Sequence, residues 1–436
     1  MSEMDLKYEC YEKDYELIVQ NSAGIANKIR SNAWKAFVES GMPVARKGNE
    51  KWKYTNVNSI LEKTFRKNAK QLSSKISAES IPCGSTSHIK IVLLDGHLSE
   101  DLSSNMKAFD GITITTIQEG LDVGNENKHF AKHSSLKDGF VSLNTALFNE
   151  GISVEVEPKT EPITLELLHF TTGSKGVANY PRLLVNLKEN SNLTLIEGFF
   201  SNNDGEHFTD AVTEIVLDPG SRMVHARVML ENLDSVHMGT TNVYQSSDSE
   251  FKSASFSKGS KLARNEMSVL LDGPGSSCDL SGLYLTVDDQ HVDNLINIDH
   301  AKPNCTSNIK YKGILDGNSR AIFGGEVIVR KDAQKTNALQ SDKNLVLSNG
   351  AEIDSKPSLW IYADDVQCGH GATAGSINGD TVFYMKSRGL DERTASRFLI
   401  HAFAREIIET IDDPDFMQYL DDMYESSIPD VTLNLA

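Results

Sequence analysis

The sequence of 436 residues predicts a mainly β fold: a parallel β-solenoid flanked by α-helical regions at both ends. The first observation is that apolar residues have a helical spacing up to about residue 80 and again after residue 380, with short alternating strands between. The second is that small polar turns recur between those strands at nearly equal intervals, as in folds built from stacked repeats. The expected regions are residues 1–85 (helical), 86–378 (solenoid) and 379–436 (helical).

The N-terminal region is expected to contain two helical stretches. Apolar residues recur every three to five positions before the helix breaker Gly41-Met42-Pro43, which predicts a first amphipathic helix. A second stretch is expected from Val57 through Leu61 to Phe65. The apolar residues of the first helix are Ile25, Ile29, Trp34, Phe37 and Val38.

Strands are expected from about His88 onward. Ile89, Ile91 and Leu93 occupy alternating positions, and residues 112–117 form a run of β-branched side chains. Further along, Asn192, Ser221, Ser249 and Ser277 mark polar turns at intervals of 29, 28 and 28 residues. This recurrence favours a solenoid over a β-sandwich, whose closer turn spacing would also fit. Since no helical pattern separates the strands, a doubly wound α/β sheet is disfavoured.

The C-terminal region is expected to form a helical hairpin. Asp380 can cap a helix over residues 381–388 that ends at Gly389, and Asp391 can cap the next helix. The second helix carries a predicted apolar stripe, with arginines elsewhere on its surface. The stripe consists of Ala395, Phe398, Leu399, Ala402, Phe403 and Ile407.

Composition excludes several classes of protein. Hydrophobic residues make up 39% of the chain, enough for a core, and the net charge of −18 argues against nucleic acid or an anionic membrane as a partner. No apolar run approaches the roughly 18 residues of a membrane span, and the polar start lacks the apolar core of a secretory signal. Five cysteines without a CxxC pair indicate neither a disulfide framework nor a zinc ribbon. We therefore expect a soluble cytoplasmic protein with reduced thiols.

Known catalytic motifs are absent from the sequence. The dipeptide Gly-Lys never occurs, so there is no Walker A loop, and we expect the chain neither to bind nor to hydrolyse ATP. There is also no GxSxG elbow, no HExxH and no GxGxxG after a strand. The chain is therefore expected not to be an enzyme.

The candidate functional pair is Cys368 and His370, which project from one face if this segment is extended. A thiolate and an imidazole suit iron, zinc or transferable sulfur, but two ligands are half a site. The remaining ligands would come from another subunit, whose backbone the neighbouring Gly369 and Gly371 would let approach. The alternative is that Cys368 packs inward as a small hydrophobic residue and His370 makes a turn hydrogen bond.

Two other polar clusters are interpreted as structural. His291, Asp293, His300 and Cys305 could close a metal site, but we favour polar residues on the outside of a β-coil. The pair Asp364-Asp365 fits the solvated end of a strand better than an acid–base pair.

Several long segments resemble the SufB/SufD family of the SUF iron–sulfur cluster assembly machinery. The resemblance is nearly continuous from about His291 to Ile411 and reappears at the N-terminal segment NEKWKYT (49–55). At Cys368–Thr373, CGHGAT resembles the SufD branch of the family rather than the SufB branch, where this segment reads more like EHEAS. Gly369 departs from the serine that is common in the family. The other matching segments are HVDNLINIDHAKPNCTSNIKYKGILDG (291–317), KDAQKTNALQSDKNLVLS (331–348), KPSLWIYADDVQCGHGATAG (356–375) and FYMKSRGL (383–390).

The resemblance implies a right-handed parallel β-helix and a non-catalytic scaffold. Such a subunit joins one SufB and two copies of the ATPase SufC, which accounts for the missing Walker A loop, and a homodimer is the alternative when SufB is absent. The nascent cluster would form at the SufB interface, where His370 matches the family's histidine ligand and Cys368 matches a nearby cysteine of less certain role.

The resemblance also implies a SufC-docking surface and a reduced flavin in the complex, whose site no motif locates. A β-helical carbohydrate-active protein is the rival interpretation, but it would carry a secretion signal and clustered carboxylates on one face. The docking surface would contain Phe383, Tyr384, Arg388, Gly389, Arg393 and Phe398.

Overall fold

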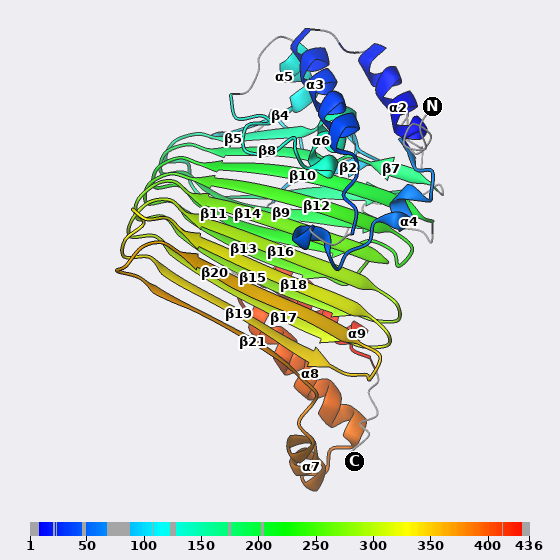
Figure 1. Ribbon diagram of the computed structural model, residues 1–436, viewed down its shortest axis with the longest axis vertical. Helices are drawn as coiled ribbons and strands as arrows, with labels where there is room; N and C mark the ends of the chain where they lie inside the picture. The colour runs from blue at the N-terminus through cyan, green and yellow to red at the C-terminus, as the bar shows by residue number, and fades with distance from the viewer. Residues whose placement is uncertain are drawn as a thin grey trace.

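In the computed structural model, the middle of the chain winds as a parallel β-solenoid whose coils stack along the long axis of the molecule (Figure 1). The structure describes residues 8–429 apart from 21, 23, 46–48, 68–87, 108, 123–127, 173–175, 202–204 and 412. The predicted boundary between residues 85 and 86 lies outside the described residues. Among the described residues, no helix is long and apolar enough to cross a membrane.

Each coil contributes one strand to each of two sheets, so strands β8 to β21 alternate between the sheets. The first sheet has 11 strands: β1 (Arg66–Lys67), β4 (Ile112–Thr116), β5 (Ile152–Val156), β7 (Val177–Asn179), β8 (Arg182–Leu187), β10 (His207–Leu217), β12 (Val236–Gln245), β14 (Leu262–Leu271), β16 (His291–His300), β18 (Arg320–Val329) and β20 (Glu352–Ile361). The second has 10: β2 (Ile89–Leu94), β3 (His97–Leu98), β6 (Ile163–Thr171), β9 (Asn192–Ser201), β11 (Arg222–Leu230), β13 (Glu250–Ser257), β15 (Ser277–Thr286), β17 (Thr306–Leu315), β19 (Asn337–Val346) and β21 (Gln367–Gly375).

The strand register confirms the repeat that the turns predicted. Arg222 on β11 lies opposite Asn192 on β9 and opposite Glu250 on β13, and both pairings are parallel. A coil therefore spans 30 residues on one side of β11 and 28 on the other. Since a sandwich would pair neighbouring strands antiparallel, this stacking confirms the solenoid.

The polar turns stack as well as the strands. Asn190, Gly220 and Asp248 adopt left-handed conformations with φ of 58°, 68° and 56°, which suit glycine, asparagine and aspartate. Backbone hydrogen bonds join successive turns: Asn190 N donates to Pro219 O (3.0 Å) and Gly220 N to Ser247 O (2.9 Å). The recurring small residues thus mark one turn conformation that is repeated along the solenoid.

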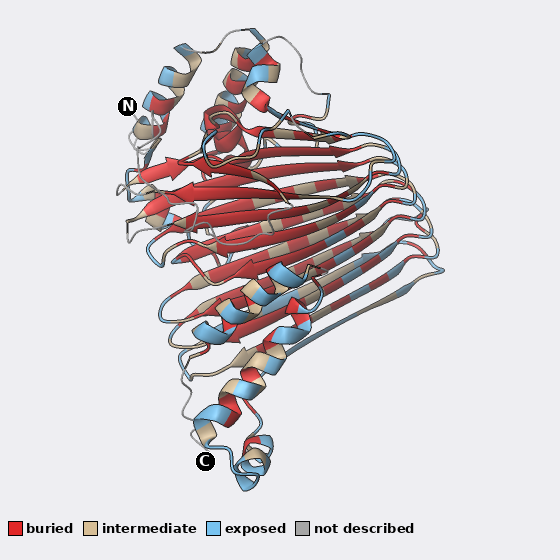
Figure 2. Ribbon diagram, turned by 180° about the vertical axis from the view of Figure 1, so that it is seen from behind, coloured by how far each residue is buried: buried red, intermediate tan, exposed pale blue. Residues whose placement is uncertain are grey.

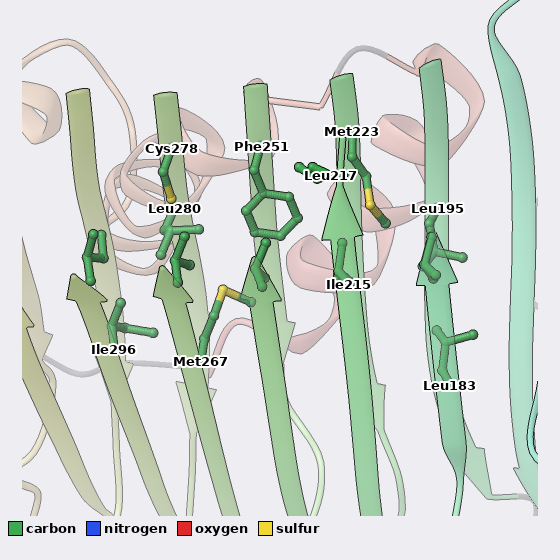
Figure 3. Packing of buried hydrophobic residues seen from close by; sticks show 14 of the residues in the cluster. Leu183, Leu195, Ile215, Leu217, Met223, Phe251, Met267, Cys278, Leu280 and Ile296 are labelled. Atoms are coloured by element: carbon green, nitrogen blue, oxygen red, sulfur yellow. The ribbon is translucent and has the colours of Figure 1, made fainter. Parts of the chain in front are cut away.

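Apolar side chains fill the space between the two sheets. Met223, Phe251 and Cys278 occupy one register position on consecutive strands of the second sheet and form a column (Figure 3). All three side chains are buried. Full burial of a side chain of this kind contributes roughly 1.5–3 kcal/mol to the free energy of unfolding. The core therefore runs along the solenoid axis.

Part of this interior is charged. His225 Nε2 lies 3.2 Å and Arg227 Nη1 3.6 Å from Glu197 Oε2. Arg227 Nη2 lies 3.3 Å from His237 Nε2, and His237 Nδ1 lies 2.7 Å from Glu231 Oε2. All five side chains are buried. They form a continuous network in which each carboxylate is paired, as burial of charge requires.

The helices of the N-terminal region, and two more within residues 117–147 of the region expected to be solenoid, pack beside the first coils (Figure 1). Helix α3 contains the predicted apolar positions, and Phe37 is fully buried, but Val38 is 53% exposed. The helix predicted over 57–65 is wrong, because only 58–61 are helical; Phe65 instead packs on Phe208 (5.9 Å between ring centroids). The elements are α2 (Glu9–Gln20), α3 (Gly24–Ser40), η1 (Glu50–Trp52), α4 (Asn58–Leu61), α5 (Ile117–Asp122) and α6 (Gly139–Leu147).

The C-terminal region contains the two predicted helices, α7 (Gly379–Ser387) and α8 (Glu392–Ile408), and a third, α9 (Pro414–Ser427), that the sequence analysis missed. Asn378, not Asp380, caps α7, because its side chain accepts the bond from Thr381 N. Gly389 follows α7 with φ of 94°, as expected of a helix end, and Asp391 caps α8. A missed signal for α9 is Asp413, whose side chain caps it ahead of Pro414.

The predicted apolar stripe of α8 is displaced around the helix. Ala395 and Ile407 are buried as predicted, and Leu399 and Phe403 are half-buried, whereas Phe398 and Ala402 are exposed. The stripe was wrong at these two positions because the face that packs is centred about one position further along the helix. The buried residues of α8 are Ala395, Ser396, Ile400, Ala404, Ile407 and Ile408.

Helices α8 and α9 lie across the outer face of the second sheet (Figure 2). Lys312 Nζ on β17 donates to Phe403 O (2.9 Å), and both Lys312 and Lys310 pair with Glu406. Tyr424 of α9 donates to Leu283 O of β15 (2.9 Å). These contacts fasten the two helices to the solenoid, whereas α7 projects beyond it (Figure 1).

Candidate functional site

The last coil of the solenoid is uncovered along its edge. Among the described residues, β20 pairs only with β18, and β21 only with β19. Their outer edges therefore present backbone N–H and C=O groups without strand partners. Figure 2 shows that these two strands are far less buried than those of the preceding coils.

Cys368 and His370 lie on β21 and share one face, as the sequence predicted for an extended segment. Cys368 lies opposite Ala338 and His370 opposite Gln340. Ala338 and Gln340 are both buried, because they face the interior of the solenoid. The same face of β21 therefore continues the interior to its open end, where His370 is exposed.

The environment of Cys368 differs from that of His370. The side chain of Cys368 is half-buried and packs against the interior core. Burial raises the pKa of its thiol above the ordinary value, which disfavours the thiolate that binds metal. In this chain alone, Cys368 therefore behaves as a small apolar residue, and His370 is the more available donor.

Small residues leave β21 open to another chain. Apart from the chain neighbours, no atom of the described residues lies within 4 Å of the position that a Cβ would take at Gly371 or Gly375, and neither glycine has positive φ. By contrast, a Cβ at Gly313, inside the solenoid, would clash with Asn344 and with the ring of Tyr284. No contact with the described part of the chain requires glycine at 371 or 375, so their small size leaves room for an outside partner.

A polar floor beneath β21 was missed by the sequence analysis. Gln340, Asp342 and Asn344 occupy alternate positions of β19, and all three are buried. Burial raises the pKa of Asp342 to about 6, against the lowering effect of the nearby Ser355 hydroxyl and of Asn344, whose side chain donates to Oδ2. Polar residues with a period of two suggest an outer face, and only the register shows that these face inward.

The predicted docking residues form an exposed patch on α7 and the start of α8, which we call the α7–α8 patch. Phe383 is 71% exposed, Tyr384 58% and Phe398 62%. Arg388 Nη2 donates to the Tyr384 hydroxyl (3.0 Å), and Gly389 and Arg393 are also exposed. Exposed aromatic residues beside arginines are typical of protein interfaces.

The second polar cluster is structural. Thr55, in the N-terminal segment, donates to Asp293 and lies 3.1 Å from His291 Nε2, while Arg264 pairs with Asp293. His291 and Asp293 thus lie on the outer face, as interpreted, but beneath the N-terminal segment.

His300 and Cys305 differ from the expectation of an outer position. Both are fully buried, because their strand register and turn place them inside: His300 Nε2 lies 2.8 Å from the Ser307 hydroxyl, and Cys305 belongs to the interior core. No group of three or more His, Cys, Asp or Glu residues within the described part of the chain could hold a metal ion.

Fold and site together define a class of protein: a parallel β-solenoid with candidate metal-binding side chains, His370 and Cys368, at an uncovered end. The family model for the SufBD core domain of SUF system FeS cluster assembly matches residues 169–403. The model for the SufBD protein N-terminal region matches residues 2–163. The chain belongs to the SufB/SufD family of iron–sulfur cluster assembly proteins.

Relatives from several organisms support this membership. The iron–sulfur cluster assembly protein SufD of Escherichia coli is 30% identical, over 87% of this chain and 88% of its own. A SufBD family protein of Synechocystis is 30% identical, over 84% of this chain and 83% of its own. The chloroplastic protein ABCI7 of Arabidopsis thaliana is 34% identical over a shorter stretch, 60% of this chain and 55% of its own.

Proposed function

We propose that this chain is a non-catalytic scaffold subunit for iron–sulfur cluster assembly. Its open coil end would pair with a SufB-type subunit, or with a second copy of the chain, and its α7–α8 patch would dock a SufC-type ATPase. Family membership supports the role in cluster assembly. The observation that carries the pairing is the uncovered pair of strands β20 and β21, with His370 exposed between glycines.

Strand pairing across the open end would satisfy the free backbone groups. An extended segment of a partner can add to an exposed sheet edge through main-chain hydrogen bonds. The small residues of β21 leave that edge accessible from both faces. The partner would thereby bring its own donors beside His370.

The nascent cluster is the cargo of this shared site. His370 supplies one donor from this chain, and the partner supplies the donors that the described residues of this chain lack. Cys368 is the weaker donor, because its side chain is half-buried and the pKa of its thiol is raised. ATP would be hydrolysed by the docked subunit, since this chain contains no Walker A loop.

A reduced flavin would belong to the assembled complex rather than to this chain by itself. The described residues assign no group that would bind it, and its role would be to deliver electrons during assembly.

The pairing can be tested by removing one N–H group from the open edge. Gln367 N donates to the backbone oxygen of Thr336, the residue just before β19, and alternate residues of a parallel strand bond to the same neighbour. The N–H of Ala372 therefore points away from β19. Proline is tolerated on edge strands where the N–H faces outward, so Ala372→Pro should fold while losing the pairing.

The matched control is Ala372→Ser, which keeps the N–H and nearly the same size. Each variant would be co-expressed with a SufB-type partner, and the complex measured by size exclusion with light scattering. We expect normal complex with Ala372→Ser and a loss of complex with Ala372→Pro, at similar melting temperatures. A folded Ala372→Pro variant that pairs normally would refute pairing through this edge.

A further inference from the structure

The interior of the solenoid becomes polar immediately below its open end. On β17, the positions that face inward opposite Gln340, Asp342 and Asn344 are Ile309, Tyr311 and Gly313. The strand below is therefore apolar or small where β19 carries three oxygen-bearing side chains. These polar groups lie one strand beneath His370, at the end that we propose is completed by a partner.

A chain of hydrogen bonds orients Asp342. The Tyr284 hydroxyl donates to Asn344 Oδ1 (2.5 Å), and Asn344 Nδ2 donates to Asp342 Oδ2 (2.7 Å). Gly313 makes room for this chain, because a side chain there would clash with both Tyr284 and Asn344. One carboxylate oxygen is thus fixed by two successive donors.

The other oxygen of the carboxylate is uncommitted. Asp342 is 1% exposed, and among the described residues its Oδ1 has no partner in hydrogen-bond geometry, although the Ser355 hydroxyl lies close enough to lower the pKa of the carboxyl. The neighbouring Gln340 is arranged in the same way: its Nε2 donates to Ser358 O (3.0 Å), while its Oε1 is buried and finds no partner among the residues that the structure describes. A buried oxygen without a donor costs stability, so two of them side by side at the open end call for an explanation.

The register places these oxygens within reach of His370. His370 lies opposite Gln340, and Asp342 lies opposite Ala372, two positions further along the same inward face. Strand spacing and rise put the Cα atoms of Asp342 and His370 about 8 Å apart, a separation that one ion can bridge with both side chains turned toward it. Ala372 is the small residue above Asp342.

We propose that Asp342 is a second donor from this chain to the cargo metal, through its uncommitted Oδ1, with Gln340 Oε1 beside it. The site that His370 shares with the partner subunit thereby extends one strand into the solenoid. A carboxylate, an amide oxygen and an imidazole suit a divalent ion such as Fe²⁺. The hydrogen bonds from Tyr284 to Asn344 and from Asn344 to Asp342 would orient the carboxylate, as outer hydrogen bonds do for carboxylates that bind metals. This inference rests on the proposed pairing.

The test measures metal binding rather than cluster assembly. Complexes of the full chain with its SufB-type partner would be titrated anaerobically with Co²⁺, whose visible absorption reports coordination. Asp342→Asn should weaken Co²⁺ binding about tenfold or more, as loss of a metal-ligand interaction does. The same substitution should raise the melting temperature, because it removes an unpaired buried carboxylate.

The matched control is Asp210→Asn on β10. Asp210 is also buried, and neither of its carboxylate oxygens has a hydrogen-bond partner in the described ranges, but it lies far from the open end. The control should leave Co²⁺ binding unchanged. Tyr284→Phe keeps the ring but removes the hydroxyl that begins the chain of hydrogen bonds to Asp342, so it should weaken Co²⁺ binding several-fold. This variant tests the assignment of Asp342 if Asp342→Asn does not fold.

The outcomes separate this inference from the proposed function. Native Co²⁺ affinity in a complex that contains Asp342→Asn, or Tyr284→Phe where the former does not fold, would overturn the assignment and leave the pairing intact. Failure of the native chain to form any complex would overturn the pairing, and this inference with it.

Discussion

The two ends of the solenoid are finished in different ways. At the N-terminal end the outermost strands are short, two residues in β3 and five in β4, and both pair antiparallel with their neighbours. Helices α3 and α5 lie over this end (Figure 1). At the C-terminal end the outermost strands are long, ten residues in β20 and nine in β21, and no described strand or helix covers their edges.

This difference indicates that the N-terminal end serves the folding of the chain and the C-terminal end serves its assembly with a partner. Short edge strands and covering helices are the devices by which proteins prevent unwanted strand pairing. The chain uses both at one end and neither at the other. The outermost interior positions differ as well: they are apolar on β2 and β4, whereas β19 carries the polar floor, and the charged network lies between them on β9, β11 and β12. One end is thus complete by itself, and the other has the features of an interface.

The largest effect is expected from truncating an apolar side chain at the closed end. Ile114 on β4 is 3% exposed, so Ile114→Ala should lower the free energy of unfolding by about 2–5 kcal/mol. Leu359 on β20 is only half-buried, and Leu359→Ala should cost the isolated chain about 1 kcal/mol or less. Urea unfolding of the two variants measures the difference.

The same pair can be measured again in the complex with the partner. Pairing would bury Leu359 further, so the penalty of Leu359→Ala should grow there, whereas that of Ile114→Ala should not change. Equal penalties for the two variants in the isolated chain would contradict the contrast between the ends.

Acid should weaken the charged interior near the closed end. Burial lowers the pKa of His169 to about 4, and Glu197, Arg227, Glu231 and His237 face it. Between pH 6.5 and 4 the unfolded chain binds a proton at this histidine that the folded chain does not, so stability is lost as pH falls. The loss is up to about 3 kcal/mol, at 1.36 kcal/mol for each pKa unit.

His169→Phe tests this acid effect. Within the described part of the chain, neither ring nitrogen of His169 has a hydrogen-bond partner, and its ring stacks on Phe199 (4.8 Å between centroids), so phenylalanine should fit. The variant should lose less stability than the native chain between pH 6.5 and pH 5 in urea unfolding. An identical loss in both proteins would show that other groups determine the acid sensitivity. Below about pH 4.5, protonation of Glu197 and Glu231 should destabilise both proteins further, because Arg227 and His237 hold those pKa values low despite burial.

At the open end, His370→Ala should leave folding unchanged and reduce cluster assembly. The side chain is exposed, so its removal leaves no cavity, but it takes one donor from the shared site. Visible absorption of purified complexes should show about a tenfold lower cluster content, within the range for loss of metal-site interactions. Cys368→Ala, a matched change two residues away, should have a milder effect, because its thiol is half-buried and its pKa is raised.

Unchanged cluster content in the His370→Ala complex would make this residue a surface histidine. A larger loss with Cys368→Ala than with His370→Ala would reverse the order of the two donors. In both variants the amount of complex serves as the control, since neither substitution touches the N–H groups of the edge.

The fold could be predicted from the sequence because its main signal is local. Each stacked turn needs, at the same position of the repeat, a residue that can adopt the left-handed conformation. The spacing of Asn190, Gly220 and Asp248 therefore gives the length of a coil directly. Which face of a helix packs is set by tertiary contacts, and the predictions for Val38 and Phe398 were therefore wrong.

The candidate site could be predicted only in part. Cys368 and His370 are two residues apart in one strand, so their common face follows from local geometry. Asp342 is separated from His370 by a whole coil, and only the strand register brings them together. The uncovered edge also escapes prediction, because the sequence does not show which strand remains last.

The smallest effect is expected at the α7–α8 patch, which tests whether docking is independent of the open end. Arg388 is exposed and holds Tyr384 through a 3.0 Å hydrogen bond, while Arg393 is exposed at the start of α8. Arg388→Glu or Arg393→Glu should weaken binding of a SufC-type ATPase several-fold, because charge reversal opposes the complementarity of an interface. Arg405→Glu, an exposed change further along α8, is the matched control and should bind normally. Pull-down with the ATPase measures docking, and light scattering of the SufB-type complex measures pairing, which should be unaffected in all three variants. Undiminished pull-down with both patch variants would place docking elsewhere, and loss of pairing together with docking would show that the patch and the open end act as one surface.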